Sequence, residues 1–249
     1  MLRNFLLVLL FTFSAMHTLA QGLRVAISPD YPPMAYKQDG RIVGIEADNA
    51  LALGKILGQK MTLVEMPFEK MLPALQSGEV DVIMSGFSVT QERSKQVLFT
   101  DPYMKMGQMA IMHRDKVSQF AQPWAVYREG VRIGVEPGTT GADFAEQKLK
   151  DAQIKYVADS AAAFAALRAD EIDLYIHDAP TSWRLATAAE NNDLISLYAP
   201  LTDETLAWAV RKDDVALADE FNRALGKMKG NGTLRYILNR WIPVTVEVR

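Results

Sequence analysis

The segment from residue 85 to residue 93, SGFSVTQER, combines an accessible backbone with a planar cation. Gly86 has no side chain, so a ligand can come close to the backbone there, and Ser88 offers a hydroxyl and an N–H group. Arg93 carries a guanidinium that can hold a carboxylate through two parallel hydrogen bonds. These residues indicate an anion site, with a solvent-exposed ion pair to a neighbouring acid as the alternative role of Arg93.

Three further groups of residues suit a small polar ligand. Thr140 lies just before a predicted helix, where N–H groups and hydroxyls bind an anion or simply cap the helix. Asp178 follows an apolar run and can accept from an ammonium group, and the adjacent His177 can hydrogen-bond a ligand; both can equally serve the structure. The aromatic residues near these segments can pack against a ligand or belong to the core; they are Tyr31, Tyr36, Phe68 and Phe87.

The inventory of residues argues against several other classes of protein. The chain has 249 residues, no Cys and three His, and it lacks the motifs of serine hydrolases, zinc proteases, phosphate-binding loops and EF-hands. We therefore expect no metal, no cofactor and no catalytic nucleophile with its base. The formal net charge of −3 argues against a nucleic-acid partner, which usually requires a basic surface.

The candidate residues lie at the ends of strands in an alternating pattern of strands and helices. Strands are predicted at residues 23–27, 61–66, 80–84, 131–135 and 155–158, and helices at 46–57, 70–76, 142–149 and 161–167. This alternation indicates parallel sheets, in which ligands bind beyond the carboxyl ends of the strands. The polar loops expected at those ends are residues 28–36, 85–93, 136–141 and 177–181.

Two short patterns recur in both halves of the chain. The run LRVAISP at 23–29 resembles VRIGVEP at 131–137, and EVD at 79–81 resembles EID at 171–173. Their common order predicts two related lobes. Strands at 107–113 and 205–211 are candidate connections between the lobes, and helices at 215–229 and 233–241 would return to the first lobe.

The first twenty residues have the pattern of a secretory signal peptide. Arg3 precedes the apolar run FLLVLLFTF, and Thr18-Leu19-Ala20 places small residues at the usual cleavage distance. The run is shorter than the roughly 20 residues that span a bilayer. We therefore expect an exported protein from which residues 1–20 are removed, with no lipid anchor because no Cys stands at the cleavage site.

Together these motifs resemble the extracytoplasmic solute-binding proteins that deliver polar amino acids to ABC importers. The matching segments lie between about Leu23 and Trp241; they are 85–93, FTDPY at 99–103, GTT at 138–140, HD at 177–178 and NGT at 231–233 with Trp241. The resemblance implies an α/β fold of periplasmic-binding-protein type II. Each of its two lobes is a mainly parallel sheet flanked by helices, and the ligand cleft lies between them. We expect residues 21–108 and 208–249 in the first lobe and 109–207 in the second.

The resemblance also implies a role for each candidate residue. Arg93, Ser88 and Thr140 would hold the α-carboxylate of an amino acid, and Asp178 and Ser85 its α-ammonium group. The side-chain pocket would be formed by Tyr31, Phe68, Glu136 and His177. A protein of this kind is a periplasmic monomer that passes its small ligand to a permease in the inner membrane.

Two departures from the family pattern bear on the ligand. Binders of basic amino acids commonly have an acid where Ser28 stands, so a Lys or Arg ligand is less supported. Glu136 replaces an apolar or basic residue and could select a cationic or hydroxylated side chain. Because the family also includes sensor domains and a cyclohexadienyl dehydratase, the alternatives are a sensor and an enzyme. The enzyme would eliminate water from prephenate or arogenate, with Glu136 or His177 as its acid–base group.

Overall fold

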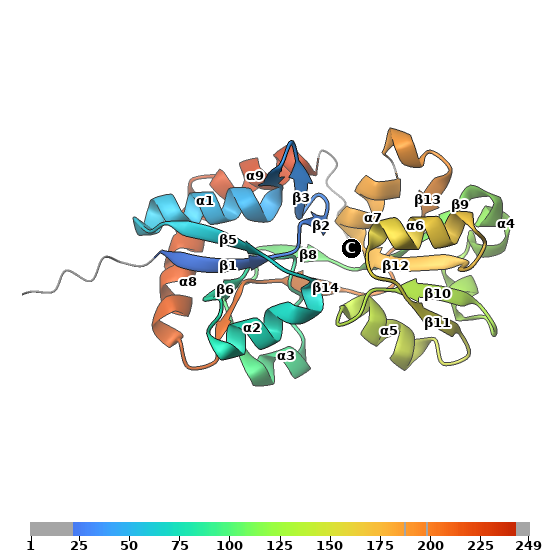
Figure 1. Cartoon of the computed structure of the whole chain (residues 1–249), viewed down its shortest axis with the longest axis horizontal. Helices are drawn as coiled ribbons and strands as arrows, with labels where there is room; N and C mark the ends of the chain where they lie inside the picture. Colours follow the sequence, from blue (N-terminus) through green and yellow to red (C-terminus); the bar gives the residue numbers. More distant parts are fainter. Residues whose placement is uncertain (1–21, 187, 198, 243–249) are drawn as a thin grey trace, which may run out of the picture.

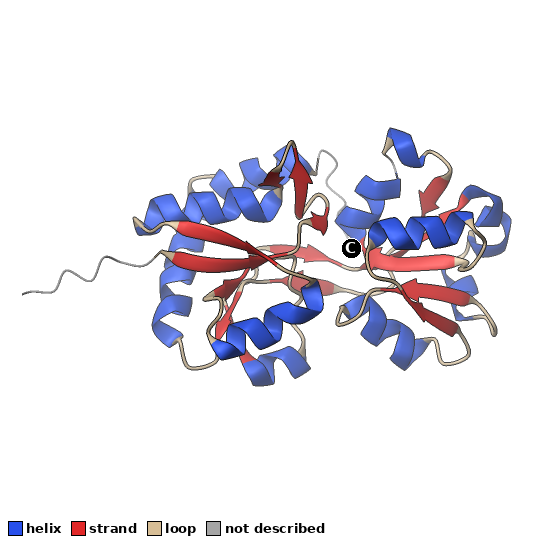
Figure 2. Ribbon diagram, in the orientation of Figure 1, coloured by secondary structure: helices blue, strands red, loops and turns tan. Residues whose placement is uncertain are grey.

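The chain forms two lobes, each with one five-stranded sheet between helices (Figures 1 and 2). The computed structural model describes residues 22–186, 188–197 and 199–242, so the predicted signal peptide lies outside the described residues. The predicted two-lobed α/β fold is confirmed. In the described part of the chain, no helix has the length and apolarity that crossing a membrane requires.

The first lobe is built on the sheet β5-β1-β6-β15-β7. Its strands are β1 (Leu23–Ile27), β5 (Met61–Glu65), β6 (Val82–Ile83), β7 (Val97–Phe99) and β15 (Ala209–Arg211). β1 runs parallel to β5 and β6, whereas β15 is antiparallel to both of its neighbours. The helices of this lobe are α1 (Ile45–Leu57), α2 (Met71–Ser77), α3 (Gln91–Gln96), α8 (Val215–Gly230) and α9 (Thr233–Trp241), with the 3-10 turn η1 (Phe68–Lys70).

The two faces of this sheet are covered by different helices. Val25 of β1 packs in the core under α1, α8 and α9, where Leu53 and Phe221 are fully buried. The next residue, Ala26, points to the other face and packs with Leu75 of α2. This alternation is the period-2 pattern of a strand buried on both sides.

The second lobe repeats the arrangement with the sheet β11-β10-β12-β9-β13. Its strands are β9 (Gln108–His113), β10 (Arg132–Val135), β11 (Gln153–Tyr156), β12 (Leu174–Asp178) and β13 (Leu194–Ser196). β10 is parallel to β11 and β12, and β9 is antiparallel to its neighbours. The helices are α4 (Val117–Phe120), α5 (Thr140–Lys148), α6 (Ser160–Arg168) and α7 (Ala179–Ala186), with the 3-10 turns η2 (Arg114–Lys116), η3 (Pro123–Tyr127) and η4 (Ala189–Asn191).

A two-stranded antiparallel sheet lies where the chain passes between the lobes (Figure 1). Its strands are β8 (Met104–Met106), which precedes β9, and β14 (Glu204–Leu206), which precedes β15. A small sheet of β2 (Asp30–Tyr31), β3 (Ala35–Gln38) and β4 (Arg41–Val43) follows β1. The two connections are thus tied to each other by the pairing of β8 with β14.

One ion pair is repeated in the two lobes at equivalent positions. In the first lobe the main-chain N–H and the guanidinium of Arg24 donate to Asp81 at 2.8–3.0 Å. In the second lobe Arg132 makes the same three bonds to Asp173 at 2.6–3.1 Å. The first pair joins β1 to the residue just before β6, and the second joins β10 to the residue just before β12. The first recurring sequence pattern therefore contains the Arg of this ion pair, and the second recurring pattern contains its Asp.

Several predicted loops and boundaries were wrong. The predicted loop 28–36 contains β2 and the start of β3, α3 begins within the loop 85–93, and α5 begins at Thr140, inside the loop 136–141. The predicted strand 80–84 is only Val82–Ile83. His177 and Asp178 lie in β12 rather than in a loop, because β12 pairs with Met109 and Gln108 of β9. That pairing partner lies about 70 residues away in the chain and leaves no local signal.

We predict that Asp173→Asn lowers the free energy of unfolding by about 1–3 kcal/mol near pH 7, because Asn cannot accept the full set of bonds from Arg132. Burial alone would raise the pKa of Asp173, but bonds from Arg132 and Lys116 outweigh it and lower the pKa to about 2. The advantage of wild type is therefore present above the unfolded pKa of about 3.9 and is lost as the pH falls toward 2. Urea unfolding at pH 7 and at pH 2.5 measures this difference, with the exposed Asp151→Asn as control. A loss that is the same at both pH values would contradict the assignment.

Candidate ligand-binding site

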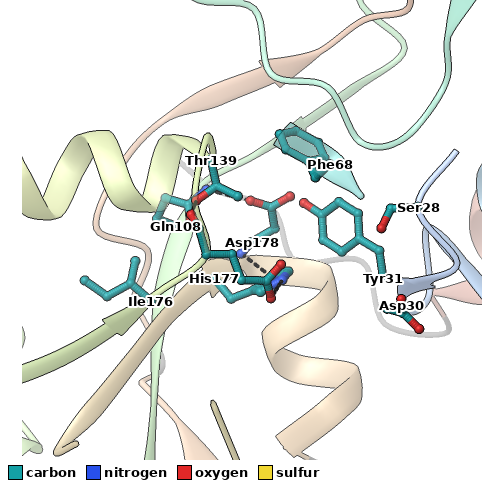
Figure 3. A pocket seen from close by; sticks show the side chains of 10 residues that line it. Ser28, Asp30, Tyr31, Phe68, Gln108, Thr139, Ile176, His177 and Asp178 are labelled. Atoms are coloured by element: carbon teal, nitrogen blue, oxygen red, sulfur yellow. Dashed lines mark hydrogen bonds and ion pairs between the residues drawn. The ribbon is translucent and has the colours of Figure 1, made fainter. Parts of the chain in front are cut away.

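A pocket lies between the lobes at the carboxyl ends of β1, β10 and β12 (Figure 3). The first lobe contributes the residues that follow β1 and the aromatic ring of Phe68 in η1. The second lobe contributes residues at the ends of β10 and β12 and at the start of β9. The lining residues are Ser28, Asp30, Tyr31, Phe68, Gln108, Glu136, Thr139, Ile176, His177 and Asp178. Parallel strands expose their carboxyl ends at one edge, so the fold itself brings these residues together.

Asp178 has a buried carboxylate oxygen that no described residue contacts through a hydrogen bond. Only 5% of the residue is exposed. Oδ1 accepts from Gln108 Nε2 at 2.5 Å, while Oδ2 has no hydrogen-bond partner among the described residues. Burial, and secondarily the negative charge of Glu204, raises the pKa of Asp178 well above its ordinary value. A buried acceptor of this kind is unfavourable unless a donor reaches it.

Gln108 is the residue that orients Asp178, and the sequence analysis missed it. Its amide also donates to Thr140 Oγ1 at 3.0 Å, and Thr140 in turn donates to Glu204 Oε2 at 2.8 Å. The first turn of α5 leaves room for this amide because residue 141 is glycine: a Cβ there would lie 2.9 Å from Gln108 Oε1. The only local signal was a polar residue at the start of the apolar run QMAIM.

Glu136 lies in a polar cluster on the second lobe. It accepts from the hydroxyls of Tyr175 and Ser160. His177 Nδ1 accepts from the N–H of Asp178, which leaves Nε2 as the nitrogen of the ring that can donate, 3.6 Å from Glu136 Oε1. Burial alone would raise the pKa of Glu136, but His177 and the two hydroxyls lower it below its ordinary value. Glu136 therefore stays ionised although it is largely buried.

The aromatic side chains predicted beside the ligand come from the first lobe. Tyr31 packs edge-on against Phe68, with ring centres 6.4 Å apart, and against His177 at 4.9 Å. The pocket thus has aromatic walls from one lobe and polar groups mainly from the other (Figure 3).

Four predicted site residues do not line this pocket: Arg93, Ser88, Thr140 and Ser85. Arg93 lies over the ring of Phe68, which does line the pocket, with its guanidinium carbon 5.6 Å from the ring centre. Ser85 Oγ accepts from the N–H of Ser28, and Thr140 holds Gln108. Each of these residues except Ser88 is thus in contact with a residue of the pocket wall. Their roles toward a ligand remain predictions.

Arg93 connects the two lobes. Its guanidinium donates to the carbonyl of Ser88 in the first lobe and to that of Gly138 in the second, both at 2.9 Å. It also lies over Phe87 with a distance of 4.2 Å to the ring centre. Burial lowers the pKa of Arg93 to about 10, which the charges of Asp143 and Glu204 oppose only in part. No carboxylate among the described residues forms a salt bridge with it, so the predicted ion pair with a neighbouring acid is absent there.

The segment that carries Ser85 and Ser88 is held by the buried carboxylate of Glu46. Oε1 accepts from the N–H of Gly86 at 2.9 Å and from the Tyr103 hydroxyl at 2.6 Å. Oε2 accepts from the Trp208 indole at 3.0 Å and from Asn49 at 3.5 Å. Burial raises the pKa of Glu46, and these donors oppose the rise. One side chain thus fixes the position of the backbone beside the pocket.

The family model described as "Bacterial extracellular solute-binding proteins, family 3" matches residues 23–244. The chain belongs to this family. Among its relatives, "ABC transporter arginine-binding protein 1" of Escherichia coli (strain K12) is 30% identical over 246 residues, covering 94% of this chain and 95% of that protein. The resemblance noted from the sequence is therefore confirmed.

Two solved structures of binding proteins share the fold. "The ancestral amino acid-binding protein AncCDT-1, a precursor of cyclohexadienyl dehydratase" superimposes with a TM-score of 0.81 at 32% identity, covering 89% of this chain and 95% of that one. "An ancestral arginine-binding protein bound to glutamine" gives 0.83 at 29% identity, covering 90% and 98%. The family likeness thus extends over both lobes.

Sequence reasoning also missed Asp30 and Ile176 in the pocket wall, and from the segment GTT at 138–140 it chose Thr140 rather than Thr139, which lines the pocket. Asp30 belongs to a segment rich in turn-forming residues, and nothing local distinguishes it from an ordinary turn acid. Ile176 lies in the apolar run of β12, which reads as core. These positions become visible only when the two lobes are placed against each other.

We predict that Glu46→Gln destabilises the protein by about 2–4 kcal/mol, because the amide N–H₂ would face donors that now bind a carboxylate. Guanidinium unfolding measures the change, and Asp219→Asn, an exposed position on α8, is the matched control. If Glu46→Gln were as stable as the control, Glu46 would not hold the Gly86 segment as described.

Proposed function

We propose that the protein binds an amino acid between its two lobes in the periplasm and delivers it to an ABC importer in the inner membrane. The observation that carries the proposal is the buried Oδ2 of Asp178, a residue of the pocket wall, which has no donor among the described residues. An α-ammonium group supplies both the positive charge and the N–H donors that this oxygen lacks. The relative named as an arginine-binding protein of an ABC transporter supports the transport role.

Arg93 is the proposed partner of the α-carboxylate, together with the N–H groups of Ser88 and Thr140. Two backbone carbonyls and an aromatic ring now surround its guanidinium, which keeps donors beyond the two bonds it makes. The pKa of Arg93, lowered by burial, indicates that a negative charge beside it would be favourable. Ser85 is proposed to assist at the ammonium side, and Tyr31 and Phe68 to enclose the apolar part of the ligand.

The proposal includes binding without a chemical step and a monomeric protein. A ligand that contacts both lobes favours the closed arrangement, which is the form a transporter can recognise. Glu136 and His177 are assigned to ligand contact rather than to proton transfer. The likeness to a precursor of a dehydratase makes prephenate and arogenate the substrates to test against this assignment.

The proposal is tested with protein freed of carried-over ligand by unfolding and refolding. A thermal-shift series with the twenty amino acids should give a concentration-dependent rise in Tm for one or a few of them. The protein incubated with prephenate or arogenate should form no aromatic product. No shift with any amino acid at millimolar concentration, or product formation above the buffer rate, would sink the proposal.

We predict that Asp178→Asn weakens the best ligand at least about 100-fold in calorimetry, since loss of a buried charge-assisted bond is worth roughly 3 kcal/mol. The ligand-free variant should be no less stable than wild type, because it no longer buries an unpaired carboxylate. Because the pKa of Asp178 is raised in the folded state, this residue makes wild type less stable as the pH rises above about 4. Asp178→Asn should lack this pH-dependent loss of stability. Retained affinity would contradict the ammonium assignment.

We expect Arg93→Ala to abolish ligand binding while circular dichroism shows an intact fold. Lys95→Ala, at an exposed position on the same short helix, is the control and should bind as wild type does. Micromolar affinity in Arg93→Ala would show that the carboxylate is held elsewhere.

A further inference from the structure

An acidic groove continues outward from the pocket beside Asp178. It encloses about 390 Å³, more than ten times the roughly 30 Å³ of one water. The groove and the pocket share Ser28, Asp30, Phe68 and Glu136. The acids of the groove are Asp30, Glu65 and Glu69 from the first lobe and Glu136 and Asp159 from the second. Neither set of lining residues includes a Lys or an Arg.

Some of these carboxylates already have partners. Glu65 pairs with Lys37 at 2.6 Å, and Asp159 Oδ1 caps α6 by accepting from the N–H of Ala162 at 2.8 Å. Glu136 is held by Tyr175, Ser160 and His177. Asp30 forms no ion pair or hydrogen bond through its side chain with any residue that the structure describes.

The acids of the two lobes act on one another across the cleft. Burial raises the pKa of Asp30, and the negative charges of Asp159 and Glu136 in the second lobe raise it further; Lys37 opposes this only in part. Like charges that face each other between lobes oppose closure. A cation placed between them removes this repulsion and gains attraction from both sides.

Asp178 gives an independent indication of a ligand in the same pocket. Its Oδ2 is buried, has no partner among the described residues and lies in the wall that also contains Asp30 and Glu136. A ligand ammonium at Asp178 places the rest of the ligand beside Tyr31 and Phe68, whose rings suit an apolar stem and an approaching cation.

We propose that the acidic groove is the subsite for a positively charged ligand side chain, held between Asp30 of one lobe and Glu136 and Asp159 of the other. The ligand class is an amino acid that ends in a guanidinium or a second ammonium group. This inference rests on the proposed function and specifies its ligand. The sequence made a Lys or Arg ligand less supported, because Ser28 stands where binders of basic amino acids commonly have an acid. Asp30 of the same lobe and Glu136 and Asp159 of the opposite lobe line the same space instead, so the inference reverses that expectation.

The test compares charged ligands with neutral ligands of the same shape. Calorimetry at low salt pairs L-arginine with L-citrulline and L-lysine with L-norleucine. In wild type, the better-bound of the two cationic amino acids should have an affinity at least about tenfold higher than that of its neutral partner, a difference of about 1.4 kcal/mol in binding free energy. In the double variant Asp30→Asn/Asp159→Asn this ratio should fall to about threefold or less. Asn at residue 159 preserves the helix cap, because Asn caps as well as Asp.

Glu129→Gln is the matched control, since Glu129 is exposed on the second lobe and lines neither the pocket nor the groove. It should keep the wild-type ratio. The inference is overturned if citrulline and norleucine bind wild type as tightly as their charged counterparts, or if the double variant keeps the full ratio. Binding of L-glutamine with no preference for charge would refute the subsite alone, whereas no binding of any amino acid would refute the proposed function as well.

Discussion

The buried carboxylate of Glu46 is the interaction on which the position of the site depends. It belongs to the first turn of α1, yet its four donors come from Asn49, the Gly86 segment, Tyr103 and Trp208. These parts of the chain are as much as 162 residues apart. Because a charge buried in an apolar core is tolerated only with such donors, the network is satisfied in only one arrangement of the lobe. The backbone from Ser85 to Ser88 is therefore fixed before any ligand arrives.

Much of the scaffold could be predicted because its signals are local or repeated. Short apolar runs located the central strands of both five-stranded sheets, but not β2, β3, β4, β7, β8 or β13. The similar segments around Arg24 and Arg132 indicated two related lobes. The structure explains why these segments recur. In each lobe the Arg of the first recurring segment binds the Asp of the second, which is Asp81 in one lobe and Asp173 in the other. A partly buried pair with several hydrogen bonds restricts which residues can occupy both positions, and so it leaves a readable pattern in the sequence. Boundaries were less predictable because strand ends depend on pairing with distant partners, as at His177 and Asp178.

The site was only partly predictable for a related reason. Residues that resemble a family motif, such as Asp178 and His177, could be chosen from sequence, and both line the pocket. Gln108 could not, because its role depends on Gly141 leaving space for its amide and on Thr140 accepting from it. Asp30 acquires its significance only from Glu136 and Asp159, which reach the cleft from the other lobe. Composition could not reveal these charges, since a net charge of −3 says nothing about which acids face each other.

The distribution of charge in the cleft links ligand selection to closure. Arg93 joins the lobes through the carbonyls of Ser88 and Gly138, and no acid among the described residues forms a salt bridge with it, although Asp143 and Glu204 act on its charge from farther away. The residues that line the pocket include carboxylates from both lobes and no basic residue other than His177. Neither Arg93 nor Asp178 forms an ion pair with another described residue, and both side chains are buried. Under the proposed function, a ligand with one carboxylate and more than one cationic group balances the two regions at once. The same contacts that favour the closed lobes then discriminate between ligands, because a neutral side chain would leave Asp30 and Asp159 facing each other across the cleft.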